Sequence, residues 1–206
     1  RLVMVDEQHR FGVHQRLSLR DKGDEGEYSP HQLILTATPI PRTLAMSAYA
    51  DLDVSVIDQL PPGRMPVQTS AMANSRRDEV IARIAGLCRQ GHQVYWVCTL
   101  IDESEEIQAQ SAQAAFELIS QSLPDCAVAL LHGKVPPAEK SRIMQAFKAN
   151  QVQVLVATTV IEVGVDVPNA SVMVIENAER LGLAQLHQLR GRVGRGSVAS
   201  HCLLLY

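Results

Sequence analysis

Short apolar runs separated by turn residues recur along the chain, and each has the length of a buried strand. They lie at Leu2–Val5, Leu33–Leu35, Val54–Ile57, Val94–Cys98, Val128–Leu131, Val152–Ala157, Val172–Ile175 and Cys202–Leu205. Because successive positions within a run are apolar, we expect both faces of each strand to be covered. The pattern therefore predicts parallel sheets in the interior of an α/β protein.

Segments with the period of an amphipathic helix lie between several of these runs. One carries Val80, Ile84 and Cys88 at four-residue intervals, after Ser75 as a candidate N-cap. A second is expected to begin at the two prolines at 136 and 137. A third covers about residues 104–122, and its predicted buried side consists of Ile107, Ala114, Ala115 and Leu118. Strands alternating with helices at this spacing predict helices on both faces of a mostly parallel sheet.

A proline-rich segment divides the chain. Residues 61–66 contain three prolines and one glycine and cannot form regular structure, so we interpret them as a linker. Residues 67–206 then form one lobe, and residues 1–60 contribute about three strands to another. Three strands are too few to bury a parallel sheet, so we expect this first lobe to be incomplete and the chain to be a piece of a longer protein.

Composition narrows the class of protein. With 46% hydrophobic and 20% charged residues and no run of about 18 apolar residues, the chain reads as a globular protein without a membrane span or a membrane partner. The net charge is −3, but residues 180–206 contain four arginines and no carboxylate, which favours a local contact with an anion such as phosphate. Four cysteines without a CxxC pair predict a cytoplasmic location.

Polar residues that could carry chemistry follow the first two apolar runs. Asp6-Glu7-Gln8-His9 places two carboxylates at a strand exit, where one could hold a hydrated Mg2+ and the other could activate water. The alternative is a charged boundary between strand and loop. Thr36 and Thr38 follow the next run, and their hydroxyls could contact the acidic cluster or cap a helix.

Two further groups lie in the second half. Thr158, Thr159, Gly164 and Asp166 follow a buried strand, where a phosphate could bind at a helix N-terminus; a capped loop is the alternative. If residues 186–195 are helical, one face carries Gln188, Arg192 and Arg195 for an anion, and the other packs through Leu186, Leu189 and Val193. A solvated arginine face is the alternative for that helix.

Taken in order, DEQH, TAT, TT…GxD and QxxGRxGR resemble motifs II, III, V and VI of superfamily 2 helicases and translocases. The longer strings DEQHRFGVHQR, TATPIPRTLAM, DLDVSVIDQLPPGR and LGLAQLHQLRGRVGRG resemble most closely the bacterial members that remodel stalled replication forks. The resemblance covers essentially the whole chain. It implies two RecA-like lobes of the P-loop NTPase type, which in this family carry the ATP-binding and C-terminal helicase functions.

The resemblance also implies a role for each motif residue. Asp6 would hold Mg2+, Glu7 would act on the attacking water, and Gln8 and His9 would sense the nucleotide. The catalytic set would be completed by Gln188, Arg192 and Arg195, acting on ATP bound to the other lobe. The remaining assignments are coupling and DNA contact for Thr36, Thr38, Thr158 and Thr159, and nucleotide contact for Gly164 and Asp166.

The implied activity is that of an ATP-dependent DNA helicase that remodels stalled forks and branch-migrates Holliday-type junctions in DNA repair and recombination. Its implied cofactors are ATP and Mg2+, its partners are forks, four-way junctions and single-stranded-DNA-binding protein, and its location is the cytoplasm, at the nucleoid. A transcription-repair coupling duplex translocase is the alternative. A non-catalytic scaffold is less favoured, because it would not need the Asp6-Glu7 pair. The sequence has no GxxxxGK[ST] loop, so we expect this chain alone to be inactive.

Overall fold

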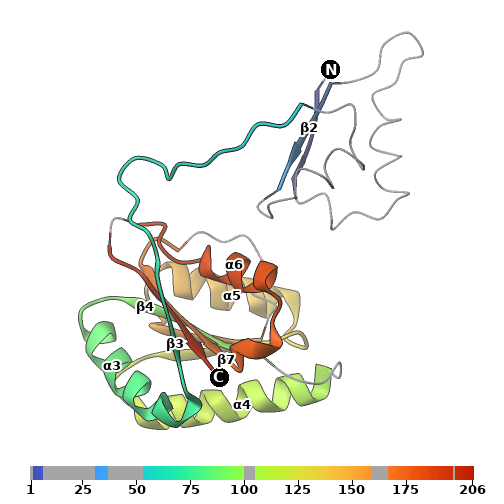
Figure 1. Ribbon diagram of the computed structural model, residues 1–206. Coiled ribbons are helices and arrows are strands. Elements are labelled where there is room, and N and C mark those ends of the chain that lie inside the picture. The colour runs from blue at the N-terminus through green and yellow to red at the C-terminus, as the bar shows by residue number, and fades with distance from the viewer. Residues whose placement is uncertain (1, 7–30, 37–52, 100–104, 159–166, 197) are drawn as a thin grey trace. The chain divides into compact units, whose positions relative to one another are not determined.

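The computed structural model describes residues 2–6, 31–36, 53–99, 105–158, 167–196 and 198–206. The chain divides into two compact units, residues 1–57 and residues 58–206 (Figure 1). The first unit contains β1 (Leu2–Asp6) and β2 (His31–Leu35), which pair in parallel with Asp6 opposite Leu35. Asp6 and Leu35, with Thr36 directly after it, therefore lie at the same edge of the pair.

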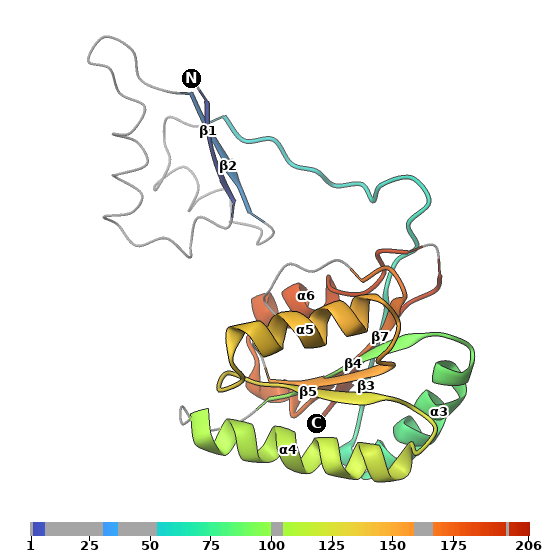
Figure 2. The same ribbon diagram turned by 180° about the vertical axis from the view of Figure 1, so that it is seen from behind.

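The second unit contains one sheet in which all six strands are parallel, in the order β3-β8-β7-β4-β6-β5. The strands are β3 (Gln68–Met72), β4 (Gln93–Cys98), β5 (Val128–Leu131), β6 (Val154–Ala157), β7 (Ala170–Glu176) and β8 (His201–Leu205). The α-helices are α3 (Arg77–Arg89), α4 (Glu105–Ser122), α5 (Pro137–Lys148) and α6 (Leu183–Arg190), with 3-10 turns η2 (Asn74–Arg76) and η3 (Ala178–Arg180). Figures 1 and 2 show α3 and α4 on one face of the sheet and α5 and α6 on the other.

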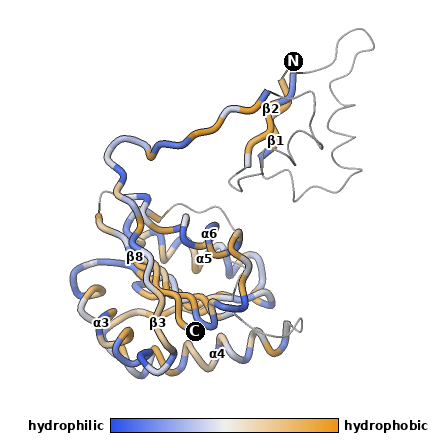
Figure 3. The backbone as a smooth tube through the Cα atoms, viewed as in Figure 1, coloured by the Kyte–Doolittle hydropathy of each residue, from blue (hydrophilic) through white to orange (hydrophobic). Residues whose placement is uncertain are grey.

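The core of the second unit is formed by alternate residues of the central strands. In β4, Val94, Trp96 and Cys98 belong to the cluster beneath α3 and α4, whereas Tyr95 and Val97 belong to the cluster beneath α5 and α6. All six residues of β4 are buried, and the central strands are coloured as mostly hydrophobic in Figure 3. Burying such a side chain contributes roughly 1.5–3 kcal/mol, so the two clusters together hold the helices on the sheet.

The parallel sheet with helices on both faces confirms the predicted α/β class. One predicted strand is wrong: Val54–Ile57 has no regular structure, and Ile57 is 92% exposed. An apolar run forms a strand only where a neighbouring strand and a covering layer are available, and neither is found here among the described residues. The prediction also missed β3, whose residues are mostly exposed and polar and which, among the described strands, pairs with β8 alone.

Two details of the predicted helices are also corrected. Ser75 lies inside η2, and Arg76 occupies the N-cap position of α3 without a side-chain cap. In α4 the buried residues include Ala112, Ala115 and Ile119, so of the four residues predicted to face the core only Ala115 does so. The buried residues Ala112, Ala115 and Ile119 are three and four positions apart, as one face of a helix requires. Ile107 does not lie on this face and is 41% exposed. Within the described part of the chain, none of the helices is long and apolar enough to cross a bilayer.

Candidate functional site

The strand pair of the first unit brings two predicted site residues to one edge. Asp6 is the last residue of β1 and pairs with Leu35, the last residue of β2. Thr36 follows Leu35 directly, 30 positions after Asp6 in the sequence. Asp6 is exposed, and a single carboxylate at a strand exit suits Mg2+, which usually takes one or two carboxylates together with substrate phosphates. The predicted residues Glu7, Gln8, His9 and Thr38 lie outside the described residues.

In the second unit, Thr158 follows β6 and lies beside the end of β5, because its backbone N–H donates to the Leu131 carbonyl at 3.1 Å. The residue is 1% exposed, and its side-chain oxygen has no hydrogen-bond partner within the part of the chain that the structure describes. A buried hydroxyl left in this state costs about 1–3 kcal/mol, so such an exception calls for an explanation. A ligand that accepts or donates a hydrogen bond here would remove this cost.

Basic side chains surround the same strand exit. His132 follows β5 and has a buried Nδ1 without a described partner. Burial, and then the charges of Lys140 and Lys134, hold the pKa of His132 below its ordinary value. Lys140 donates to the Gly133 carbonyl at 2.8 Å, and the Lys134 Nζ lies 3.2 Å from the Glu106 carboxylate on α4. We refer to His132, Lys134, Lys140 and Thr158 as the carboxyl-edge cluster, and its chemistry suits a phosphate.

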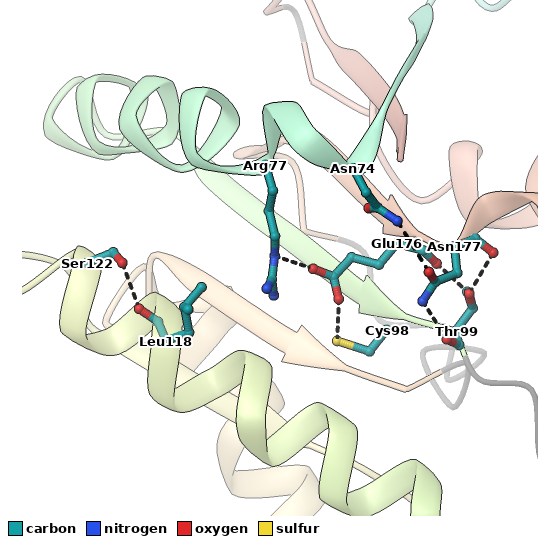
Figure 4. Close-up of polar contacts among 8 residues, drawn as sticks. All are labelled: Asn74, Arg77, Cys98, Thr99, Leu118, Ser122, Glu176 and Asn177. Carbon is teal, nitrogen blue, oxygen red and sulfur yellow. Dashed lines mark hydrogen bonds and ion pairs between the residues drawn. The ribbon is translucent and has the colours of Figure 1, made fainter. Parts of the chain in front are cut away.

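A second polar group lies at the ends of β4 and β7 (Figure 4). The Glu176 carboxylate lies 2.6 Å from Arg77 Nε and accepts a hydrogen bond from the Cys98 thiol at 3.5 Å. Arg77 lies over the Trp96 ring, 5.5 Å from its centroid. Burial, and then the nearby carboxylate, raise the pKa of Cys98. The group joins α3 to two central strands, so we interpret it as structural rather than catalytic.

Sequence reasoning missed this Glu176 group, although a signal was available. Glu176 directly follows the apolar run Val172–Ile175, and a carboxylate in that position needs a partner if it is partly buried. Its partner is 99 residues away in the sequence, and no local pattern connects the two residues.

The arginine motif adopts a geometry different from the predicted helical face. The helix α6 ends at Arg190, and Gly191 occupies its C-cap. Gln188 therefore lies on the helix, whereas Arg192 and Arg195 lie in the turn that follows, where Arg195 Nε donates to the Gly191 carbonyl at 3.2 Å. Gly194 has φ +78°, a conformation that ends a helix. We call residues 191–196 the motif VI turn.

The packing side of this motif is confirmed. Leu189 and Val193 are 7% and 3% exposed and belong to the cluster beneath α5 and α6, and Leu186 packs against it. Val167 belongs to the same cluster. The predicted residues Thr159, Gly164 and Asp166 lie outside the described residues.

Close backbone contact continues at Gly196. A Cβ on Gly196 would lie 2.6 Å from the Pro168 carbonyl oxygen, so only glycine fits beside this carbonyl without a shift. Pro168 precedes β7, just as Ser200 precedes β8. The motif VI turn is therefore held at the amino-terminal edge of the sheet, whereas the carboxyl-edge cluster lies at the opposite edge.

Comparison with known proteins identifies relatives over the whole chain. The chain is 65% identical over its 206 residues to the ATP-dependent DNA helicase RecG of Escherichia coli K12, and 66% identical to RecG of Pasteurella multocida. It spans 30% of the length of each. A solved structure of RecG bound to a three-way DNA junction matches 99% of this chain and 25% of that one, with a TM-score of 0.77 and 43% identity.

More distant structures share the fold. The helicase Lhr of Mycobacterium smegmatis, solved with single-stranded DNA and AMP-PNP, is 20% identical, with a TM-score of 0.69 over the whole chain and 28% of its own. The family model of the helicase conserved C-terminal domain matches residues 70–197, which include the carboxyl-edge cluster and the motif VI turn. The chain therefore belongs to the helicase conserved C-terminal domain family and is similar along its full length to RecG helicases.

Proposed function

We propose that the chain forms part of the motor core of an ATP-dependent DNA helicase that acts on branched DNA. The observation that carries this proposal in the structure is the carboxyl-edge cluster, where the buried Thr158 hydroxyl has no described partner at the end of β5 and two lysines act on His132, the residue that follows β5. Backbone phosphates of DNA supply both the negative charge and the hydrogen-bond acceptors that this cluster needs. Phosphate contacts do not depend on base sequence, as a translocating motor requires.

For the ATP side of the reaction, we propose that Asp6 holds Mg2+ and that Glu7 orients the attacking water, with Gln8 and His9 responding to the nucleotide. Gln188, Arg192 and Arg195 would act on the transferred phosphoryl group, and Gly164 and Asp166 would contact the nucleotide. Phosphoryl transfer depends mainly on positioning and charge stabilisation, so arginines on a short turn with a fixed backbone suit this role. Thr36, Thr38, Thr158 and Thr159 would couple hydrolysis to movement on DNA.

For the DNA substrate, we propose stalled forks and four-way junctions, with roles in repair and recombination. The solved RecG structure is bound to a three-way junction, and the relatives named above are RecG helicases, which favours this proposal over the transcription-coupled translocase. Single-stranded-DNA-binding protein is proposed as a partner and the cytoplasm as the location. The 206-residue chain alone is expected not to hydrolyse ATP, because its sequence has no Walker A loop.

The DNA contact is tested by binding of a three-way junction to the complete protein at several salt concentrations. Lys140→Gln removes one phosphate contact, so it should weaken binding and reduce the slope of log K against log salt by about 1. Thr158→Val should weaken binding with little change in slope. Lys148→Gln, an exposed lysine at the end of α5, is the matched control. Equal binding by all of these proteins would contradict the proposed DNA contact.

The activity is tested by ATP hydrolysis on a three-way junction and on linear duplex of equal length. We expect strong stimulation by the junction and a loss of roughly 10³-fold or more in Arg192→Ala. Equal stimulation by linear duplex would favour the transcription-coupled translocase. Hydrolysis that does not depend on DNA would contradict the proposed function.

A further inference from the structure

The segment that connects the two units meets the second unit at the motif VI turn. All of residues 58–66, which we call the connecting segment, are exposed. Val67 is the first partly buried residue after it, and it packs against the cluster that contains Leu189 and Val193. The next residue, Gln68, donates its backbone N–H to the Ser200 carbonyl at 2.9 Å. The connecting segment is thus anchored beside the turn that carries the two arginines.

The contact between Val67 and this turn is close. A Cβ on Gly194 would lie 2.7 Å from Val67 Cγ2, a distance that real Cβ atoms essentially never show. Gly194 is buried and has φ +78°, so glycine is needed here both for its backbone conformation and for the space taken by the valine. The β-branched side chain of Val67 is stiff at χ1 and therefore presents a fixed surface to the turn.

The turn has little freedom to move away from this surface. Val193 anchors it in the core on one side of Gly194, and the hydrogen bond from Arg195 Nε to the Gly191 carbonyl closes it on the other. Gly196 fits against the Pro168 carbonyl. A displacement of Val67 would therefore shift the backbone between Arg192 and Arg195 rather than be absorbed by loose packing.

We propose that Val67 is a positioning residue for motif VI, which couples the connecting segment to the placement of Arg192 and Arg195. This inference rests on the proposed function, because it assigns the arginines to ATP hydrolysis. Its consequence is that a change in the direction of the connecting segment is passed to the arginines through one side-chain contact. Displacing a catalytic group by about 1 Å can lower the rate roughly 10²-fold, so a small shift is enough.

The test compares steady-state ATP hydrolysis by the complete protein and its Val67→Ala variant on junction DNA. Removing both methyl groups leaves the turn unsupported, and we expect kcat to fall about tenfold or more while the KM for ATP and the DNA affinity stay within about twofold. Val67→Ile should retain most of the activity. The matched control is Val128→Ala on the edge strand β5, which packs in the other cluster and should leave kcat within about twofold.

A double-mutant cycle tests whether the effect of Val67 on kcat passes through its contact with Gly194, whereas the unchanged KM and DNA affinity separate positioning from a general loss of structure. Gly194→Ala alone introduces both the clash with Val67 and the unfavourable φ, whereas in Val67→Ala/Gly194→Ala the clash is gone. The fold loss of kcat in the double variant should therefore be several-fold smaller than the product of the fold losses in the two single variants. Independent effects in this cycle, or a Val67→Ala variant that matches Val128→Ala, would overturn the proposal. An inactive wild-type protein would instead refute the proposed function.

Discussion

Gly196 offers a sharp test of the close packing around the motif VI turn. In Gly196→Ala the new Cβ would lie 2.6 Å from the Pro168 carbonyl oxygen and 3.5 Å from its carbon. The carbonyl cannot move away freely, because the following Asn169 accepts a hydrogen bond from the Gln93 backbone at 3.1 Å and leads directly into β7. Overpacking of this kind costs about 1–3 kcal/mol, so we expect the free energy of unfolding to fall by that amount.

Urea unfolding followed by fluorescence measures this effect, because Trp96 is the single tryptophan and is fully buried in the second unit. With a slope of roughly 2 kcal/mol per M urea for a unit of this size, the midpoint should fall by about 0.5–1.5 M. Gly86→Ala inside α3 is the matched control, since its Cβ would meet nothing within 4 Å. It should instead raise the stability by about 0.5–1 kcal/mol, because alanine favours a helix. A Gly196→Ala variant as stable as wild type would refute this account of the turn.

Three further predictions use the same unfolding assay. Gln93→Leu removes two hydrogen bonds from the buried amide to backbone carbonyls, at 2.5 and 2.7 Å, and should destabilise the protein by about 1–3 kcal/mol; an unchanged midpoint would contradict this. Glu176→Gln breaks the partly buried ion pair with Arg77 and should cost about 1–3 kcal/mol, because the guanidinium is left without a carboxylate; an unchanged midpoint would contradict it. Because the folded pKa of His132 is lowered, the unfolded state binds more protons below about pH 6.5, so stability should fall as the pH drops through that value. His132→Gln should flatten this part of the profile, and an unaltered profile would count against it.

The central strands could be predicted from the sequence because their burial is complete. Every residue of β4 and β6 is buried, so a continuous apolar run is visible without any knowledge of the neighbouring elements. The edge strand β3 leaves no such pattern, because its residues are mostly exposed and its extended form depends on pairing with β8, more than 130 positions later. Val54–Ile57 shows the reverse case. This apolar run forms no strand, because no described strand pairs with it and its side chains are exposed.

The packing residues of the arginine motif were predictable from the sequence, but the backbone that carries them was not. The packing positions Leu189 and Val193 follow from helical spacing, yet the helix stops before the second of them. Gly194, in the turn that follows, has a positive φ and lies against Val67, a residue more than 120 positions earlier, and no local pattern shows this contact. Lys140 was missed for a similar reason, since it approaches His132 only when α5 packs against β5.

The proposed DNA contact at the carboxyl-edge cluster and the proposed ATP contact of the motif VI arginines lie at opposite ends of the strands of one sheet. This separation limits how binding at one of them can affect the other. The carboxyl-edge cluster follows the ends of β5 and β6, whereas the motif VI turn precedes β8 and contacts the residues before β3 and β7. Between the two edges lie strands that are fully buried and tightly packed, and such a core does not deform gradually. A phosphate bound at the carboxyl-edge cluster would therefore not reach the arginines through a gradual deformation of the core. The contact between Val67 and Gly194 offers a separate route, which leads from the connecting segment to the arginine backbone.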